Sequence, residues 1–168
     1  MAEIKKIRTR EEIPMEDKWA TEDLYPSDEA WEQELATIAA DQEKAVSFAG
    51  HLGDSAEMLF GYLDNMEKTE VKIGLLANYC MRKADEDTRN AKYQAMKGKF
   101  MSVMVALSAA CSFETPEIMA IPEEKLAQFY ADCPQLERYR RYLNNTLRMK
   151  AHTLNARSKS KRLDSWTI

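Results

Sequence analysis

The sequence predicts an all-α protein, an antiparallel helical bundle with short connections between long helices. Gly and Pro together make up only ten of the 168 residues, while Ala, Leu, Met, Glu and Lys are abundant. Unbranched side chains lose little rotamer freedom on a helix, and few residues here would break one. Apolar residues also recur at spacings of three and four, with no period-two run typical of a strand. We therefore expect about five to six helices after an extended N-terminal leader.

The leader comprises residues 1–26 and ends in the motif DLYPS. Pro26 disfavours helix at the residue before it, and Ser27 or Asp28 then supplies a side-chain oxygen for the free amides of a helix start. The apolar face of this first helix is formed by Trp31, Leu35, Ile38, Ala45 and Ala49. Gly50 is expected to end the helix, because glycine tolerates the left-handed conformation found there.

The second helix is expected to start at Asp54, which with Glu57 forms the pattern of a capping box. Its apolar face continues to Tyr79, with a break expected near residues 67–70. A further helix should run from near Ala91 and stop before Thr115.

Prolines divide the last part of the chain. Pro122 suits the first turn of a short helix that ends near Tyr130. Pro134 separates it from a last helix between Leu136 and about Lys150. We assign residues 27–154 to one helical domain and residues 155–168 to a basic tail, disordered or out of frame, because the tail shows no helical apolar period.

Charge and composition exclude several classes of function. The net charge is −4, but residues 1–10 and 155–168 each carry +3, so the body between them carries −10. An acidic body argues against nucleic acid as a partner. No run approaches the roughly 18 apolar residues of a membrane span, and no signal peptide follows Met1. Three widely spaced cysteines without a CxxC pattern indicate free thiols and a cytoplasmic location.

An acidic cluster, DEDTRN at residues 85–90, is the first candidate for chemistry. Asp85 and Asp87 match the first two ligand positions of a calcium loop, but Arg89 takes the third and Asn90 stands where the sharp turn requires Gly. A catalytic carboxylate pair would need a pocket and a perturbed pKa. The better interpretation is a structural turn made by Asp85, Asp87, Thr88 and Asn90, with Thr88 or Asn90 capping the next helix.

The sequence offers no zinc-peptidase helix. Such a helix carries two histidines one turn apart, with the general-base Glu beside the first. The only two histidines are His51, between two glycines, and His152, beyond the last predicted helix. We therefore predict no catalytic residue, no metal ligand and no cofactor in this chain.

Several large apolar residues could serve either the core or a binding surface. Those on the second predicted helix could face the core or a partner, and the methionines near Phe100 could form an adaptable peptide-binding surface or fill gaps. The candidates for contact with a peptide or a partner lobe are Tyr62, Met66, Leu75, Tyr79, Met96 and Phe100.

Taken in order, a set of motifs resembles the oligoendopeptidase F group of thimet-oligopeptidase-like zinc peptidases. They are IPxxxxWxxEDLYPSxExW (residues 13–31), GHLGDSAEML (50–59), DEDTRNAKYQAM (85–96), LSAACSFETPEIMAIPEEKL (107–126), LERYRRYLNN (136–145) and HTL (152–154). The resemblance covers roughly residues 10–154. It departs at Ala151, where the family usually has Pro, and in the tail after residue 154.

This resemblance implies a helical N-terminal lobe of a much larger enzyme. In that family two lobes enclose a channel for short peptides, and the zinc ion and the HExxH helix belong to the C-terminal part. None of those catalytic residues can be transferred to this chain, so we expect it to be inactive alone.

Two interpretations follow for the function. The chain is the non-catalytic, channel-forming lobe of such a peptidase, or it is a stand-alone helical module that binds peptides or proteins. A lobe without its partner should expose an apolar patch. We therefore also expect a homodimer through exposed apolar helix faces, with the missing catalytic lobe or short peptides as other partners.

Overall fold

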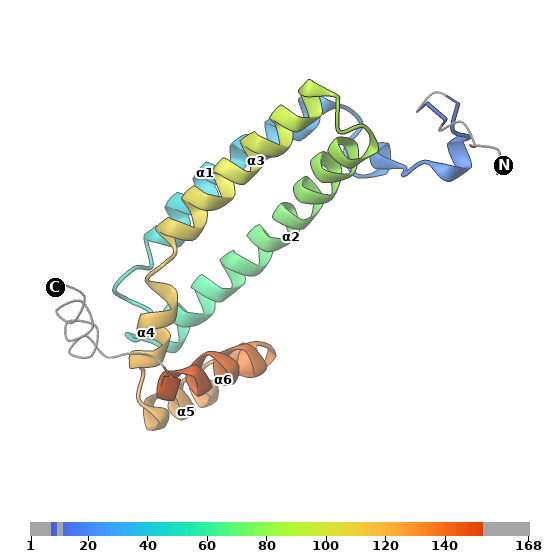
Figure 1. The fold of residues 1–168 in the computed structure, drawn as a ribbon. Helices are drawn as coiled ribbons and strands as arrows, with labels where there is room; N and C mark the ends of the chain where they lie inside the picture. Colours follow the sequence, from blue (N-terminus) through green and yellow to red (C-terminus); the bar gives the residue numbers. More distant parts are fainter. Residues whose placement is uncertain (1–7, 10–11, 153–168) are drawn as a thin grey trace, which may run out of the picture. The chain divides into compact units, whose positions relative to one another are not determined.

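The structure is a computed structural model in which residues 8–9 and 12–152 are described. These residues form α-helices and short 3-10 helices and contain no strand (Figure 1). The α-helices are α1 (Asp28–Val46), α2 (Ala56–Glu86), α3 (Ala91–Ala110), α4 (Glu114–Ala120), α5 (Glu123–Asp132) and α6 (Arg140–Arg148). The 3-10 helices are η1 (Met15–Asp17), η2 (Thr21–Asp23), η3 (Pro134–Tyr139) and η4 (Met149–His152). The predicted all-α fold is confirmed, while the predicted tail, residues 155–168, lies outside the described residues.

The chain divides into two compact units. Among the described residues, the first contains those up to Ser47 together with Asp64–Cys111, and the second contains Phe48–Leu63 and those from Ser112 onward. The first unit therefore holds α1, most of α2 and α3. The second holds the start of α2 and the helices α4 to α6.

The first unit is built around Trp31, which is fully buried on α1. Its indole Nε1 donates a hydrogen bond to the carbonyl oxygen of Leu76 on α2, at 2.9 Å. Because a buried indole N–H without a partner would be costly, this bond fixes α1 and α2 in register. α3 packs beside α1, as Figure 1 shows, and contributes Met96, Phe100 and Leu107 to the buried core.

Local chemistry explains the helix starts. The Ser27 hydroxyl oxygen accepts from the amide of Ala30 at 3.2 Å, as expected for a residue before α1. At the start of α2, Ser55 rather than the predicted Asp54 supplies the oxygen, which accepts from the amide of Met58 at 3.2 Å. Asp54 instead lies 2.7 Å from the ring of His51.

The expected break near residues 67–70 is absent, because α2 continues without interruption through this segment. Thr69 is buried there, and its hydroxyl donates to the carbonyl oxygen of Asn65 at 2.9 Å. The segment contains neither Gly nor Pro, and its charged side chains are tolerated because they lie toward solvent.

α3 ends at Ala110, before Thr115 as predicted. The sequence did not predict the separate helix α4, whose first turn contains Thr115 and Pro116, a position where proline is tolerated. The last predicted helix begins as the 3-10 helix η3 and becomes α-helical only at Arg140.

In the second unit, Tyr62 of α2 is fully buried among aromatic rings. Its ring centroid lies 6.0 Å from that of Phe48 and 5.5 Å from that of Phe113. Its hydroxyl donates to the Glu114 carboxylate at 3.0 Å. The aromatic cluster therefore joins the start of α2 to α4.

Glu117 of α4 holds the loop that precedes α2. Its carboxylate accepts from the amide of Gly50 at 2.6 Å and from the amide of Leu52 at 3.2 Å. Gly50 has a φ of 85°, a left-handed conformation that residues with a side chain rarely adopt. The predicted glycine stop is thus fixed to a helix distant in sequence.

One segment, residues 91–120, is long and apolar enough by length and composition to cross a membrane, which the sequence analysis did not expect. Only 22% of its most apolar window is buried inside the structure. Core helices of soluble proteins pass the same test, so this finding alone does not indicate a membrane protein. It does show that α3 is apolar on more than its buried side.

Candidate functional site

The acidic cluster at residues 85–90 lies between α2 and α3. The Asp87 carboxylate accepts from the Arg89 amide at 2.9 Å and from its guanidinium at 3.1 Å. These contacts with Arg89 lower the pKa of the Asp87 carboxyl. Asn90 Oδ1 accepts from the first amides of α3, at 3.1 Å and 3.4 Å, so Asn90 is the cap of that helix. Thr88 is exposed, and Asp85 lies 3.9 Å from both Arg82 and Lys97.

The geometry gives this cluster the contacts of a turn. Asp87 is bound by the basic side chain that follows it and Asn90 is bound by helix amides, so neither converges on a common centre with Asp85. Among the residues that the structure describes, no group of three or more His, Cys, Asp or Glu side chains could hold a metal ion. The described residues therefore offer no ligand set that fits the zinc ion of the peptidase family.

The cysteines and histidines are the other residues that could perform chemistry. Cys80, Cys111 and Cys133 are free and buried. Burial raises the pKa of the Cys80 thiol to about 11, so the thiol stays protonated and unreactive at neutral pH. His51 lies in the loop before α2 and His152 lies on η4, and both are exposed. Neither histidine belongs to a possible metal-binding group among the described residues.

The predicted contact residues fall into two groups. Four of them are buried core side chains: Tyr62, Tyr79, Met96 and Phe100. Met66 is half-buried, and Leu75 is 42% exposed on α2. Buried side chains are not accessible to a partner in this structure. Of the six predicted contact residues, Leu75 is therefore the most accessible.

A polar cluster that the sequence did not reveal joins all three helices of the first unit. Asp28, at the start of α1, accepts from the Tyr79 hydroxyl of α2 at 2.8 Å and forms an ion pair with Lys92 of α3. Burial alone would raise the pKa of the Asp28 carboxyl, but the hydrogen bonds from Lys92 and Tyr79 outweigh it and lower that pKa. Burial, followed by the hydrogen bond to Asp28, raises the pKa of Tyr79, which stays neutral and donates.

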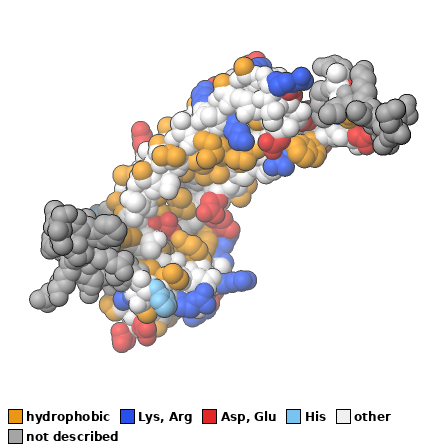
Figure 2. All heavy atoms as spheres, viewed as in Figure 1, with side chains coloured by type: hydrophobic (Ala, Val, Ile, Leu, Met, Phe, Trp, Pro, Cys, Tyr) orange, Lys and Arg blue, Asp and Glu red, His pale blue; other side chains and the backbone are white. Residues whose placement is uncertain are grey.

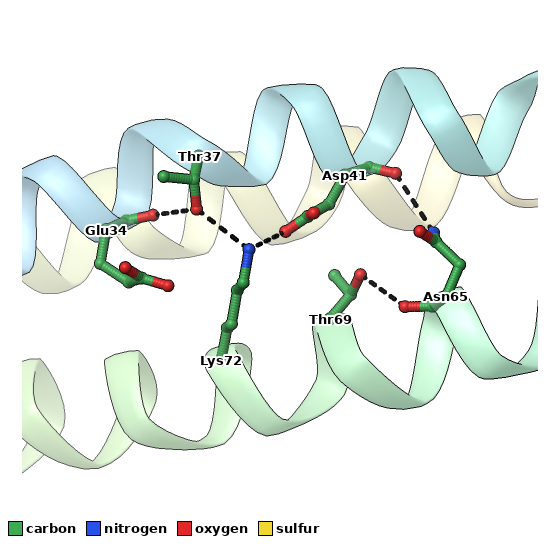
Figure 3. A network of polar contacts seen from close by, with 6 residues as sticks. All are labelled: Glu34, Thr37, Asp41, Asn65, Thr69 and Lys72. Carbon is green, nitrogen blue, oxygen red and sulfur yellow. Dashed lines mark hydrogen bonds and ion pairs between the residues drawn. The ribbon is translucent and has the colours of Figure 1, made fainter.

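A second polar network links the middle of α1 to α2, as Figure 3 shows. Lys72 Nζ lies 2.7 Å from the Asp41 carboxylate and 3.4 Å from the Thr37 hydroxyl. The side-chain amide of Asn65 donates to the Asp41 carbonyl oxygen at 3.5 Å. Both networks fix helix positions and leave no reactive group free, so their role is structural.

The apolar surface of α3 is the remaining candidate. Met101 is 46% exposed and Val105 is 67% exposed. On another side of α3, a groove of about 280 Å³ lies between α1 and α3, with Val103 and Ala106 among its lining residues and Glu32 and Lys99 at one end. Figure 2 shows hydrophobic side chains gathered along this part of the surface. Such a surface can bind an apolar partner but performs no chemistry.

The chain is similar in sequence to known oligopeptidases. The pattern of the Oligopeptidase F family matches residues 117–159. Oligopeptidase PepF of Bacillus subtilis (strain 168) is 31% identical over 95% of this chain. The plasmid-encoded oligoendopeptidase F of Lactococcus lactis subsp. cremoris is 30% identical over 88% of it. The chain resembles oligoendopeptidase F.

The resemblance extends to solved structures. Oligoendopeptidase-F from Enterococcus faecium superposes on 80% of the chain with a TM-score of 0.68 and 25% identity. A peptidase-like protein of Chlamydophila abortus covers 96% of the chain with a TM-score of 0.81, and at 24% identity this likeness concerns the fold alone. The chain spans only about a quarter of the length of these relatives: 24% of the Bacillus protein and 26% of the Enterococcus structure.

Proposed function

We propose that this chain serves as a non-catalytic N-terminal helical lobe of an oligoendopeptidase F-like zinc peptidase. One observation carries the proposal: the chain matches Oligopeptidase PepF of Bacillus subtilis over 95% of its own length but only 24% of the length of that relative. In this role its helices form part of the wall of a channel that admits short peptides.

The chemistry of the chain supports a non-catalytic role. Zinc peptidases need an ion that polarises the peptide carbonyl and activates water, with a carboxylate as general base. This sequence has no HExxH motif, and its two histidines lie at positions 51 and 152. We assign no catalytic step to any residue of this chain, and we infer a cytoplasmic location from its unpatterned cysteines.

The direct test is hydrolysis of short fluorogenic peptides by the purified chain, with added zinc and then with a chelator. We expect no turnover above that of the buffer in either condition. Turnover that the chelator abolishes would contradict the proposal, because the chain would then contain a complete zinc site. The folded state should be confirmed beforehand by the strong helical signal in circular dichroism.

A second test addresses the alternative of a stand-alone helical binding module. The DNA that follows codon 168 in the source should be sequenced and translated in every frame. An HExxH motif within the next few hundred codons supports the lobe assignment. Absence of such a frame would favour the stand-alone module.

A further inference from the structure

A groove of about 400 Å³ lies between α5 and α6 in the second unit. The two helices run in opposite directions (Figure 1), and each contributes one stripe of side chains to the groove. The stripe of α5 consists of Glu123, Leu126, Ala127 and Tyr130, and that of α6 consists of Arg140, Asn144, Leu147 and Arg148. Both stripes recur at spacings of three and four residues, so each lies on one face of its helix.

The Tyr130 hydroxyl is an unpaired polar group on the wall of this groove. Its oxygen is buried and has no hydrogen-bond partner among the described residues. Burial raises the pKa of this phenol, so it keeps its proton and can donate at neutral pH. Buried polar groups in folded proteins are nearly always paired. The unpaired phenol therefore indicates a donor for an oxygen atom of a ligand.

Two polar side chains of α6 are also available to a ligand. Within the described part of the chain, the Arg148 guanidinium forms no ion pair and the side-chain amide of Asn144 forms no hydrogen bond. An arginine can bind a carboxylate through two parallel hydrogen bonds. An asparagine amide carries a donor and an acceptor, so it can pair with a peptide group. Leu126, Ala127 and Leu147 supply the apolar part of the lining.

The charge of this region favours an anionic ligand. Residues 138–152 contain five Lys or Arg residues and no Asp or Glu, in a chain whose net charge is −4. Arg140 Nε already donates to the Glu137 carboxylate at 2.6 Å. Arg148 is therefore the cation of the lining that is left for an anion.

The spacing of these groups selects a short peptide rather than a small anion. Arg140 and Arg148 are eight residues apart on α6, which is about 12 Å along the helix axis. The Tyr130 ring lies at the Arg140 end, since its centroid is 3.9 Å from the guanidinium carbon. One small anion cannot contact both Tyr130 and Arg148 across this distance. An extended chain of about three to four residues covers it, at about 3.3–3.6 Å per residue.

We propose that the α5–α6 groove binds a short extended peptide that carries a free C-terminal carboxylate. Arg148 binds the carboxylate, Asn144 pairs with a peptide group, and the Tyr130 hydroxyl donates to a carbonyl oxygen nearer the N-terminus of the peptide. Because α5 and α6 are antiparallel, Glu123 lies at the Arg148 end and weakens the attraction of that end for a carboxylate. The site concerns binding by this chain alone, so its failure would leave the lobe assignment unchanged.

NMR titration of the purified, nitrogen-15-labelled chain with acetyl-Ala-Leu-Ala tests the proposal. The acetyl cap removes the amine that Glu123 would attract. We expect saturable shifts of the backbone amides of Ala127, Asn144 and Leu147, with a Kd in the millimolar range. The C-terminal amide of the same peptide should bind about tenfold more weakly, because it lacks the charge that Arg148 binds.

Inorganic phosphate is the second probe, because it carries charge but cannot span the groove. We expect it to bind more weakly than the free-acid peptide. Phosphate that binds as tightly, with the same shifts, would assign the groove to small anions and overturn the peptide proposal. Equal binding of the free acid and the amide, or the absence of saturable shifts with the peptide, would overturn it as well.

Substitutions test the role of each group. Arg148→Gln should weaken binding of the free-acid peptide about tenfold. The matched control is Arg141→Gln, since Arg141 is exposed on the same helix but lies outside the lining of the groove. We expect the control to bind as the parent chain does, and Glu123→Gln to bind more tightly than the parent chain. Equal effects of Arg148→Gln and Arg141→Gln would show that only the overall charge matters and would contradict the site.

Tyr130→Phe separates binding from folding. The variant should bind the peptide several-fold more weakly, because the donor is lost. Its thermal unfolding should match that of the parent chain, because the hydroxyl has no hydrogen-bond partner among the described residues. A variant that binds normally but unfolds at a lower temperature would show that the hydroxyl serves the fold and not a ligand.

Discussion

The Asp28 carboxylate is the point at which the three helices of the first unit meet, so its removal should destabilise that unit selectively. In Asp28→Ala, the Tyr79 hydroxyl loses the acceptor that lies 2.8 Å away. Tyr79 is only 2% exposed, and a buried donor left without a partner costs about 1–3 kcal/mol. Loss of a negative charge in the first turn of α1 adds about 0.3–1 kcal/mol. Loss of the ion pair adds little, because Lys92 is exposed.

The expected decrease in the free energy of unfolding is therefore about 2–3 kcal/mol. Urea unfolding followed by circular dichroism at pH 7 measures it. Glu43→Ala is the matched control, because Glu43 is exposed near the other end of α1 and makes no side-chain polar contact within the described residues. We expect the control to remain within about 0.5 kcal/mol of the parent chain.

The stabilisation by the Asp28 carboxylate should decrease at low pH. The folded-state pKa of Asp28 is lowered from its ordinary value of 3.8, so its stabilising effect is complete above that value and is lost as the pH falls through the lower folded pKa. The difference in stability between the parent chain and Asp28→Ala should shrink as acid is added. A difference that stays constant from pH 7 to below 3, or a loss no larger than that of Glu43→Ala, would refute the assigned role of Asp28.

Two further substitutions test the helix cap and the loop anchor. Asn90→Ala should cost about 1 kcal/mol in urea unfolding, because two amides at the start of α3 lose their acceptor, while Thr88→Ala should be nearly neutral; equal effects would argue against the cap. Glu117→Ala should cost about 2 kcal/mol and speed hydrogen exchange at the Gly50 and Leu52 amides, both of which it binds; unchanged exchange at these amides would show that the anchor is not formed in solution.

The sequence was sufficient for the features that depend on local chemistry. The start of α3 near Ala91 and the cap at Asn90 follow from residues within one turn of each other. Periodicity also predicted the apolar face of α1. It misplaced the cap of α2, because Asp54 and Ser55 are both good capping residues and only the backbone geometry selects between them.

The sequence did not predict the features that depend on contacts between residues distant in the chain. Asp28 and Tyr79 are 51 residues apart, and nothing in their local sequence pairs them. Tyr79 and Phe100 would lie on apolar helix faces whether those faces formed the core or a binding surface. Only the packing of the helices shows that both side chains are buried. The sequence left the methionines near Phe100 open between core and surface, because α3 is apolar on several sides and periodicity then no longer distinguishes the two. The structure shows that Met96 is buried and that Met101 and Val105 are exposed.

If this chain is equivalent to the N-terminal lobe of an oligoendopeptidase F-like enzyme, it should replace that lobe in a relative. The part of Bacillus subtilis Oligopeptidase PepF that aligns with this chain should be replaced by the chain, and hydrolysis of a short fluorogenic peptide should be compared with that of the same relative lacking that part. We expect the shortened relative to be inactive and the chimera to regain chelator-sensitive hydrolysis. A chimera that folds and binds zinc but is as inactive as the shortened relative would contradict it.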